Sequence, residues 1–252
     1  MRIIQQRTQN FNVARVANGI IFEPDVLILH TTGATLQSNI NWLGNPFSQV
    51  SYHFIIDTNG DIHQFVPITG MAWHSGTRNG NGINNNDNVH STIELVRRRN
   101  VNANVYSIGV GFAEMADSRP TEAQLNSIPD LYSWLELMGV NIPINRQHIV
   151  GHHEVTPRTR SPLGTDVGIN FPFNRLLTMI EQRKQEDEEM TQQKFNEMMD
   201  NYMQTLNTRP ASGWAVSELE EAQRRGITDG TRPQAFVTRE QSAIMALRAT
   251  NQ

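Results

Sequence analysis

Five short apolar runs in the first 180 residues constrain the fold of this chain more than any other feature. Each run has the length and the β-branched and aromatic content of a strand. The runs are DVLILHTT (25–32), SYHFIID (51–57), DIHQFVP (61–67), YSIGVGF (106–112) and HIVGH (148–152). The DTNGD segment between the second and third runs predicts a hairpin turn. Because helical patterns lie between the runs, the sequence predicts an α/β domain.

One of these helices is predicted over residues 121–139. It begins with a Thr-x-x-Gln capping pattern and ends at a glycine. Its apolar residues recur at intervals of three and four, which places them on one helical face. They are Leu125, Ile128, Leu131, Leu135 and Met138. The pattern therefore predicts an amphipathic helix within the α/β domain.

The composition changes at about residue 173. Residues 173–206 are rich in Glu, Gln, Lys, Met and Asn and contain no Gly or Pro, which predicts a helix. Residues 182–194 are almost wholly polar and indicate a solvated connector. An apolar stripe follows, made of Phe195, Met198, Met199, Tyr202, Met203 and Leu206. We interpret the stripe as a packing face for the next module or for a second chain rather than as a ligand site.

The last region, residues 209–252, contains two predicted capped helices. Ser212 precedes the first helix and Thr238 precedes the second, with GITDGTRP as the loop between them. A segment this short buries little apolar surface by itself, so we expect it to pack against a partner surface. The predicted parts are an α/β domain (1–180), a helical linker (181–208) and a small helical module (209–252).

Composition excludes several kinds of function. The formal charge of -4 and the isoelectric point near 6.1 argue against nucleic acid as a partner. The chain has no cysteine, so a metal site would have to use histidine and carboxylate ligands. No apolar run has the length of a membrane span, so we expect no membrane partner. The N-terminus does not resemble a secretory signal, so we expect the protein to stay in the cytoplasm until another factor releases it.

Two histidines and one aspartate stand out as candidate metal ligands. His30 ends an apolar strand, His152 follows Gly151 at the end of another, and Asp166 lies in the glycine-flanked loop LGTDVG. Two histidines and a carboxylate fit a catalytic zinc site, which keeps one coordination position open for water. Taken alone, His30 is more often a hydrogen-bonded residue at a strand end than a ligand. Neighbouring residues of an extended segment point to opposite faces, so we expect His153 to be structural or exposed.

Residues from about 20 to 180 resemble the type-2 N-acetylmuramoyl-L-alanine amidases, which share a fold with the peptidoglycan recognition proteins. The motifs ILHTTG, SYHFIIDTNGDIHQFVP, AWHSG, YSIGVGF and IVGHHEVTPRTRSPLGTDVG occur in the family's order. The resemblance implies a mixed central sheet flanked by helices. It also implies Zn²⁺ held by His30, His152 and Asp166, and hydrolysis of the amide between N-acetylmuramic acid and L-alanine in peptidoglycan.

The same resemblance assigns residues around the zinc site. Tyr52 matches a tyrosine that orients water or stabilises the oxyanion, although a strand tyrosine is ordinarily a packing residue. Trp73 and His74, in AWHSG, match an element of the substrate groove. His53 and His63 lie inside strands and are interpreted as structural.

Two positions depart from the family pattern. Gly111 stands where many amidases carry a glutamate, and Gly164 stands where the lysozyme-type phage members carry a lysine. We expect Arg158 or Arg160, in the same loop, to serve as the cationic partner of the oxyanion. The alternative, that both arginines are solvated loop charges, remains equally open.

Residues 210–250 resemble a single S-layer-homology motif, a module that binds secondary cell-wall polymers of Gram-positive bacteria. Such motifs commonly act in sets of three, so multivalent binding by this chain would need several copies. We expect the Phe195–Leu206 helix to assemble them as a homo-oligomer. Met190 heads the segment that carries only connector and module, and an internal start there would yield free C-terminal fragments.

Three functions remain compatible with the sequence. The first is a zinc amidase that lyses bacterial walls as a phage or prophage endolysin, released from the host cytoplasm by a holin-type factor. The second is a zinc-free peptidoglycan-binding protein, against which the presence of Asp166 argues. The third is a host autolysin exported by another route.

Overall fold

The computed structural model describes residues 2–76, 87–99, 101–113, 119–157, 166–168 and 171–250. The chain divides into two compact units, Met1–Gln185 and Glu186–Gln252. Arg158, Arg160 and Gly164 lie outside the described residues, so the expected cationic partner of the oxyanion stays a prediction.

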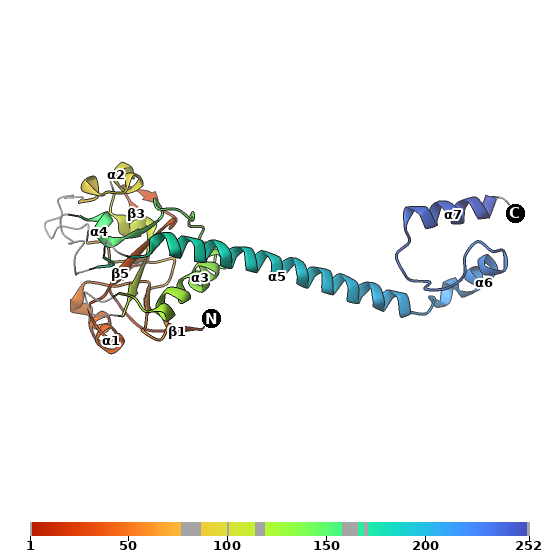
Figure 1. The fold of residues 1–252 in the computed structure, drawn as a ribbon, viewed down its shortest axis with the longest axis horizontal. Coiled ribbons are helices and arrows are strands. Elements are labelled where there is room, and N and C mark those ends of the chain that lie inside the picture. The colour runs from red at the N-terminus through yellow and green to blue at the C-terminus, as the bar shows by residue number, and fades with distance from the viewer. Residues whose placement is uncertain are drawn as a thin grey trace. The chain divides into compact units, whose positions relative to one another are not determined.

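A six-stranded mixed sheet forms the centre of the first unit (Figure 1). Its order is β1-β7-β6-β9-β5-β10. Strands β6 and β7 are antiparallel, and every other neighbouring pair is parallel. The strands are β1 (Ile3–Gln5), β5 (Val26–Thr31), β6 (Phe54–Ile56), β7 (Ile62–Gln64), β9 (Ser107–Phe112) and β10 (Ile149–Gly151). The expected α/β class with a mixed central sheet is confirmed.

The five predicted apolar runs each contribute one strand, and the predicted hairpin joins β6 to β7. Ile56 pairs with Ile62 across the turn. Gly60 supports the turn with a φ of 92°, a value that favours glycine, and its N–H donates to the Asp57 carbonyl at 2.9 Å. Strand β1 was not predicted, because its three residues form a partly exposed edge with too little alternation to recognise.

Alternation along β5 separates two hydrophobic cores. Leu27 and Leu29 face the core shared with helix α3 (Glu122–Leu137) and the first turns of α5 (Phe173–Thr208). Val26 and Ile28 face the other core, which includes residues of α2 (Glu94–Arg99) and of the 3-10 helix η3 (Ala103–Tyr106). Strands β5 and β9 are buried along their whole length because helices and loops cover both faces. His30 continues the face of Val26 and Ile28.

Helix α3 confirms the helix predicted after residue 121. Thr121 accepts a hydrogen bond from the Gln124 N–H, and the Gln124 side chain accepts one from the Thr121 N–H, which completes a capping box. Four of the five predicted apolar residues are buried against the sheet. The fifth, Met138, follows the last helical residue and is 51% exposed, because the chain has already left the helical path there.

Short elements connect these layers. Strand β2 (Phe11–Asn12) pairs with β8 (Met71–Ala72), and β3 (Val16–Ala17) pairs with β4 (Ile20–Ile21). The remaining helical elements of the first unit are α1 (Leu36–Gly44), η1 (Pro46–Ser48), η2 (Asp87–His90) and α4 (His152–Val155). The β2–β8 pair matters most for the site, because the loop after β8 carries Trp73 and His74.

Helix α5 includes both the predicted connector and the apolar stripe. It begins at Phe173, packs Leu176 and Ile180 into the core of the first unit, and continues to Thr208. Lys184 forms an ion pair with Glu136 of α3 at 2.7 Å. The predicted linker is therefore a continuation of a helix that starts in the first unit.

The second unit also contains η4 (Gly213–Ala215), α6 (Val216–Arg224) and α7 (Arg239–Thr250). Thr238 and Gln241 exchange hydrogen bonds at the start of α7, as the predicted cap requires. Ser212 precedes η4, but its side chain makes no capping hydrogen bond. No residue of α6 or α7 is buried. Among the described residues, no helix has the length and apolar character needed to cross a membrane.

Candidate metal centre

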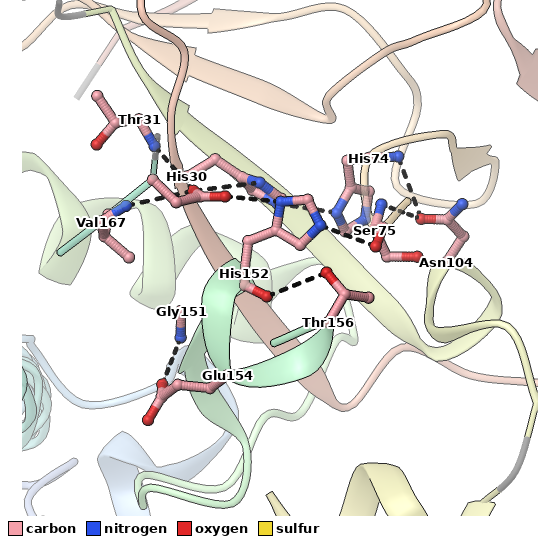
Figure 2. Close-up of polar contacts among 11 residues, drawn as sticks. His30, Thr31, His74, Ser75, Asn104, Gly151, His152, Glu154, Thr156 and Val167 are labelled. Carbon is pink, nitrogen blue, oxygen red and sulfur yellow. Dashed lines mark hydrogen bonds and ion pairs between the residues drawn. The ribbon is translucent and has the colours of Figure 1, made fainter. Parts of the chain in front are cut away.

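His30 lies near the carboxyl end of β5, where the sequence predicts a ligand. Its side chain is 1% exposed. Its Nδ1 lies 3.7 Å from Oδ1 of Asp166, and its Nε2 lies 3.0 Å from Nδ1 of His74. The ring therefore has one nitrogen directed at the candidate site and the other at a neighbouring histidine (Figure 2).

His152 occupies a different local structure from the one predicted. It is the first residue of the helical turn α4 rather than the last residue of a strand, so His153 is not on the opposite face of an extended segment. Gly151 closes the turn, because its N–H donates to the Glu154 carboxylate at 2.7 Å. Sheet register explains why His152 reaches the site. Val150 pairs with Ile28, so the residue two further on reaches the level of His30.

The two rings meet the same carboxylate. His152 Nδ1 lies 2.8 Å from Oδ2 of Asp166, and the ring centroids of His30 and His152 are 4.5 Å apart. Asp166 is held by the backbone, because its Oδ1 accepts from the N–H of Thr31 at 3.2 Å and of Val167 at 3.3 Å. One candidate ligand atom from each of the three residues lies within 4.8 Å of the others.

This donor set fits a metal ion. The three side chains are buried, and among the described residues they are the one cluster of this kind. Two neutral imidazoles and one carboxylate would leave a bound divalent cation with a single formal positive charge, and nitrogen and oxygen donors of this kind suit zinc. His30, His152 and Asp166, far apart in sequence, thus form a possible metal site, as expected.

His153 is half-buried and its ring packs against Gly151. A Cβ at Gly151 would lie 2.8 Å from the His153 ring and 2.9 Å from Val167, so glycine lets the chain turn tightly here. Burial lowers the pKa of His153, an effect that Glu154 partly offsets. The ring is not among the three candidate ligands, so its expected structural role stays a prediction.

The predicted residues around the metal site lie in contrasting environments. Tyr52 is half-buried, with its ring edge-on to His30 at a centroid distance of 4.9 Å. Trp73 is half-buried, and its indole N–H donates to Asn12 of β2 at 2.5 Å. His74 is 3% exposed, and both ring nitrogens have partners within the protein. Its predicted contact with substrate stays untested.

Burial also governs the protonation of the inner histidines. Desolvation lowers the pKa of His74 well below its usual value, and the nearby His53 lowers it further. Desolvation and the Arg15 guanidinium likewise hold the pKa of His53 well below its usual value. Both rings are therefore neutral near neutral pH. The structural role predicted for His53 agrees with its full burial away from the ligands.

Small residues on one face of β9 make room for these side chains. Ser107, Gly109 and Gly111 face the same side of the sheet as His30, because they pair in register with Val26, Ile28 and His30 of β5. A Cβ at Gly109 would lie 2.5 Å from the His74 ring. The sequence analysis gave no role to Ser107 and Gly109. The alternation of small and large residues in SIGVGF does indicate a strand face that leaves room for neighbouring side chains.

Gly111 stands where the family resemblance leads us to expect a glutamate. A Cβ there would lie 2.7 Å from the Thr32 methyl and 2.8 Å from the Ile55 side chain. These neighbours occupy the space that a larger side chain would need. The absence of a carboxylate at position 111 is thus built into the packing around β9.

The fold and the site define a class: an α/β protein with a mixed sheet and a buried pair of histidines beside an aspartate, suited to bind a metal ion. The sequence profile described as N-acetylmuramoyl-L-alanine amidase matches residues 22–164, more than half of the chain. The chain therefore belongs to the N-acetylmuramoyl-L-alanine amidase family. The match ends just before Asp166 and does not include the second unit.

Two characterised relatives illustrate the similarity. The 1,6-anhydro-N-acetylmuramyl-L-alanine amidase AmpD of Haemophilus influenzae is 27% identical over 132 residues, which cover 52% of this chain and 59% of the relative. The N-acetylmuramoyl-L-alanine amidase XlyA of Bacillus subtilis is 32% identical over 69 residues, covering 25% of this chain and 23% of the relative. The chain thus matches less than two thirds of the length of either relative.

Two solved structures illustrate the comparison at the level of the backbone. A selenomethionine derivative of AmpD aligns with a TM-score of 0.48 and 18% identity, over 71% of this chain and 94% of that one. The catalytic domain of XlyA aligns with a TM-score of 0.43 and 20% identity, over 71% of this chain and 99% of that one.

Proposed function

We propose that this protein is a zinc-dependent N-acetylmuramoyl-L-alanine amidase that cleaves the bond between N-acetylmuramic acid and L-alanine in bacterial peptidoglycan. The observation that carries the proposal is the convergence of His30, His152 and Asp166 at one end of the sheet. Family membership supports the reaction class. The buried, backbone-held carboxylate argues against the alternative of a zinc-free binding protein.

The chemistry required is amide hydrolysis. When bound, zinc would activate a water molecule and polarise the scissile carbonyl. His30, His152 and Asp166 would hold the ion, and the backbone N–H groups of Thr31 and Val167 would keep the Asp166 carboxylate in place. Tyr52, whose ring packs on His30, is proposed to donate its hydroxyl proton in a hydrogen bond to the carbonyl oxygen as negative charge develops there.

A wall-clearing assay tests this proposal. Purified peptidoglycan should lose turbidity and release new L-alanine amino groups when the protein is added, and a chelator should stop both. The variants His152→Ala and Asp166→Ala should also be inactive while remaining folded. Clearing that persists with chelator and in both variants would contradict the zinc mechanism.

The substrate distinguishes an endolysin from an enzyme of host metabolism. AmpD is named as an amidase of 1,6-anhydro-N-acetylmuramyl-L-alanine, whereas XlyA is named as an N-acetylmuramoyl-L-alanine amidase. We propose polymeric peptidoglycan as the substrate here and a phage or prophage endolysin as the role, with holin-type release from the host cytoplasm. The resemblance of residues 210–250 to an S-layer-homology motif supports a wall-bound substrate. Comparing rates on intact walls and on the soluble anhydro compound separates the roles, and a preference for the soluble compound would favour the host enzyme.

We also propose that the second unit binds a secondary cell-wall polymer as a self-associated assembly. Within the described part of residues 186–252, Leu206 is the one buried large hydrophobic side chain. At the end of the stripe, Tyr202 already contacts Phe236, with ring centroids 6.1 Å apart. Phe195 and Met198 remain 57% and 65% exposed and would be covered by a second copy. A monomeric mass in light scattering at micromolar concentration would contradict self-association.

A further inference from the structure

The loop after β8 contacts both candidate histidine ligands on the side away from Asp166. His30 Nε2 lies 3.0 Å from Nδ1 of His74, and His152 Nε2 lies 2.8 Å from the carbonyl oxygen of Ser75 (Figure 2). Two consecutive residues of one loop therefore hold the two ligands, although those ligands come from separate elements of the fold.

The contact with Ser75 fixes which nitrogen of His152 carries a proton. A carbonyl oxygen can only accept, so Nε2 of His152 must donate. As a metal ligand the imidazole must be neutral and carry one N–H, which leaves Nδ1, the nitrogen beside Asp166, to bind the ion. The backbone at Ser75 thereby selects the form of His152 that can bind a metal ion through Nδ1.

A longer chain of hydrogen bonds fixes His30. The Ser107 hydroxyl donates to the Ala103 carbonyl at 2.7 Å, so its only proton is already used. In the 3.2 Å hydrogen bond between Ser107 Oγ and Nε2 of His74, His74 must then be the donor. Full burial of the His74 ring favours the uncharged imidazole, which carries one proton. With that proton on Nε2, Nδ1 of His74 accepts from Nε2–H of His30. The proton of His30 is thus on Nε2, and its Nδ1 keeps a lone pair.

The surroundings allow the His74 ring little freedom to flip about its Cβ–Cγ bond. The backbone N–H groups of His74 and Ser75 both donate to Oδ1 of Asn104, at 3.1 and 2.9 Å. On the other side the ring lies against the bare backbone of Gly109, where a Cβ would come within 2.5 Å of it. The loop is therefore anchored through its backbone while the ring is confined by β9.

We propose that His74 and the Ser75 carbonyl are the positioning groups of the metal centre. They orient His30 and His152 with both Nδ1 atoms available to the ion, and Ser107 extends the chain to the fixed Ala103 carbonyl. The proposal rests on the proposed zinc site, and it gives His74 a role in holding a ligand in addition to, or in place of, the expected contact with substrate. Outer partners of this kind fix the tautomer and orientation of a metal-binding histidine.

Zinc affinity of the full-length protein is the first test, measured by competition with a chromophoric chelator. His74→Phe keeps the ring volume but removes both nitrogens, and we expect zinc to bind about 10- to 100-fold more weakly. His74→Asn offers a side-chain oxygen near the place of Nδ1 and should recover much of that loss. His63→Phe is the matched control: this histidine is also buried, at 6% exposed, but its ring hydrogen-bonds Gln6, so zinc affinity should not change. Wild-type affinity in His74→Phe would overturn the proposal.

A second test needs no metal and no activity. Long-range ¹H–¹⁵N correlation spectra of the metal-free protein should show His30 and His74 each protonated at Nε2. Ser107→Ala removes the acceptor that holds the His74 proton, so the signals of both rings should shift toward a tautomer mixture while the melting temperature changes little. A His30 protonated at Nδ1 in the folded wild type would overturn the proposal. A wild type that shows the expected tautomers but binds no zinc would instead contradict the proposed function.

Discussion

The two units of this chain differ in how far they bury their side chains. In the first unit, β5 and β9 are buried along their whole length, and backbone N–H groups hold the buried Asp166 carboxylate. In the second unit, no residue of α6 or α7 is buried, and Trp214 is 82% exposed. A buried and anchored site is preorganised for chemistry, whereas an open apolar surface is suited to a partner. We therefore expect substitutions in the first unit to lower activity and stability, and substitutions in the second unit to weaken association.

The largest effect is expected from loss of a ligand in the first unit. Asp166→Ala removes the carboxylate that both histidines face. Since a metal ion contributes several kcal/mol to catalysis, amidase activity should fall by at least about 1,000-fold. Initial rates of amino-group release from purified walls measure the loss. Circular dichroism should show a folded variant, and residual activity within about tenfold of the wild type would mean that Asp166 does not hold the metal.

A steric change beneath the site should have the next largest effect. Gly109→Ala places a Cβ 2.5 Å from the His74 ring, and the central strand β9 cannot move away easily. We expect a loss of about 1–3 kcal/mol in the free energy of unfolding, because the ring must leave its position. Gly44→Ala is the control, since its Cβ would make an ordinary 3.7 Å contact with the Arg7 carbonyl oxygen. Urea unfolding of both variants tests this, and equal stabilities would show that His74 is not confined by β9.

Acid should destabilise the first unit through His53. The Gly109 N–H donates to Nδ1 of His53 at 2.9 Å, and Nε2 lies 3.1 Å from the Gly70 carbonyl oxygen and 2.7 Å from the Arg15 guanidinium. His74 packs against the same ring, at a centroid distance of 5.8 Å. A proton added to Nδ1 would displace the Gly109 hydrogen bond and face the charge of Arg15.

The sign of the pH effect follows from the lowered pKa of His53. Its stabilising contribution is complete above the unfolded value of about 6.5 and is lost as the pH falls below it, because only the unfolded chain takes up the proton. The free energy of unfolding should therefore decrease by up to about 1.4 kcal/mol per pH unit below about pH 6.5. Comparing the metal-free wild type with His53→Gln isolates this residue. Parallel pH profiles for the two proteins would contradict the assignment.

How far the sequence predicted this site depends on the range of the interactions involved. His30, His152 and Asp166 were identifiable because strand ends and glycine-flanked loops mark them locally, and α3 was identifiable from its cap and periodicity. Ser107 and Asn104 were not, because their roles depend on contacts with His74 about 30 residues away that only the sheet register creates. The turn at His152 was also missed, because a Gly-His-His segment after an apolar pair is compatible with a strand or a helix start.

The smallest effect on stability is expected from removing the second unit. A chain ending at Gln185 keeps Leu176 and Ile180 in the first core and loses none of the buried hydrophobic side chains of that unit. Its melting temperature should lie within a few degrees of the full-length value, because the hydrophobic core of the first unit stays complete. Wall binding and self-association should both be lost, which co-sedimentation with purified walls and light scattering would detect. Phe195→Ser in the full-length protein is the milder companion and should weaken association without changing the melting temperature. A large drop in melting temperature on truncation would show that the two units fold as one, and would contradict the expectation that the first unit is stable without the second.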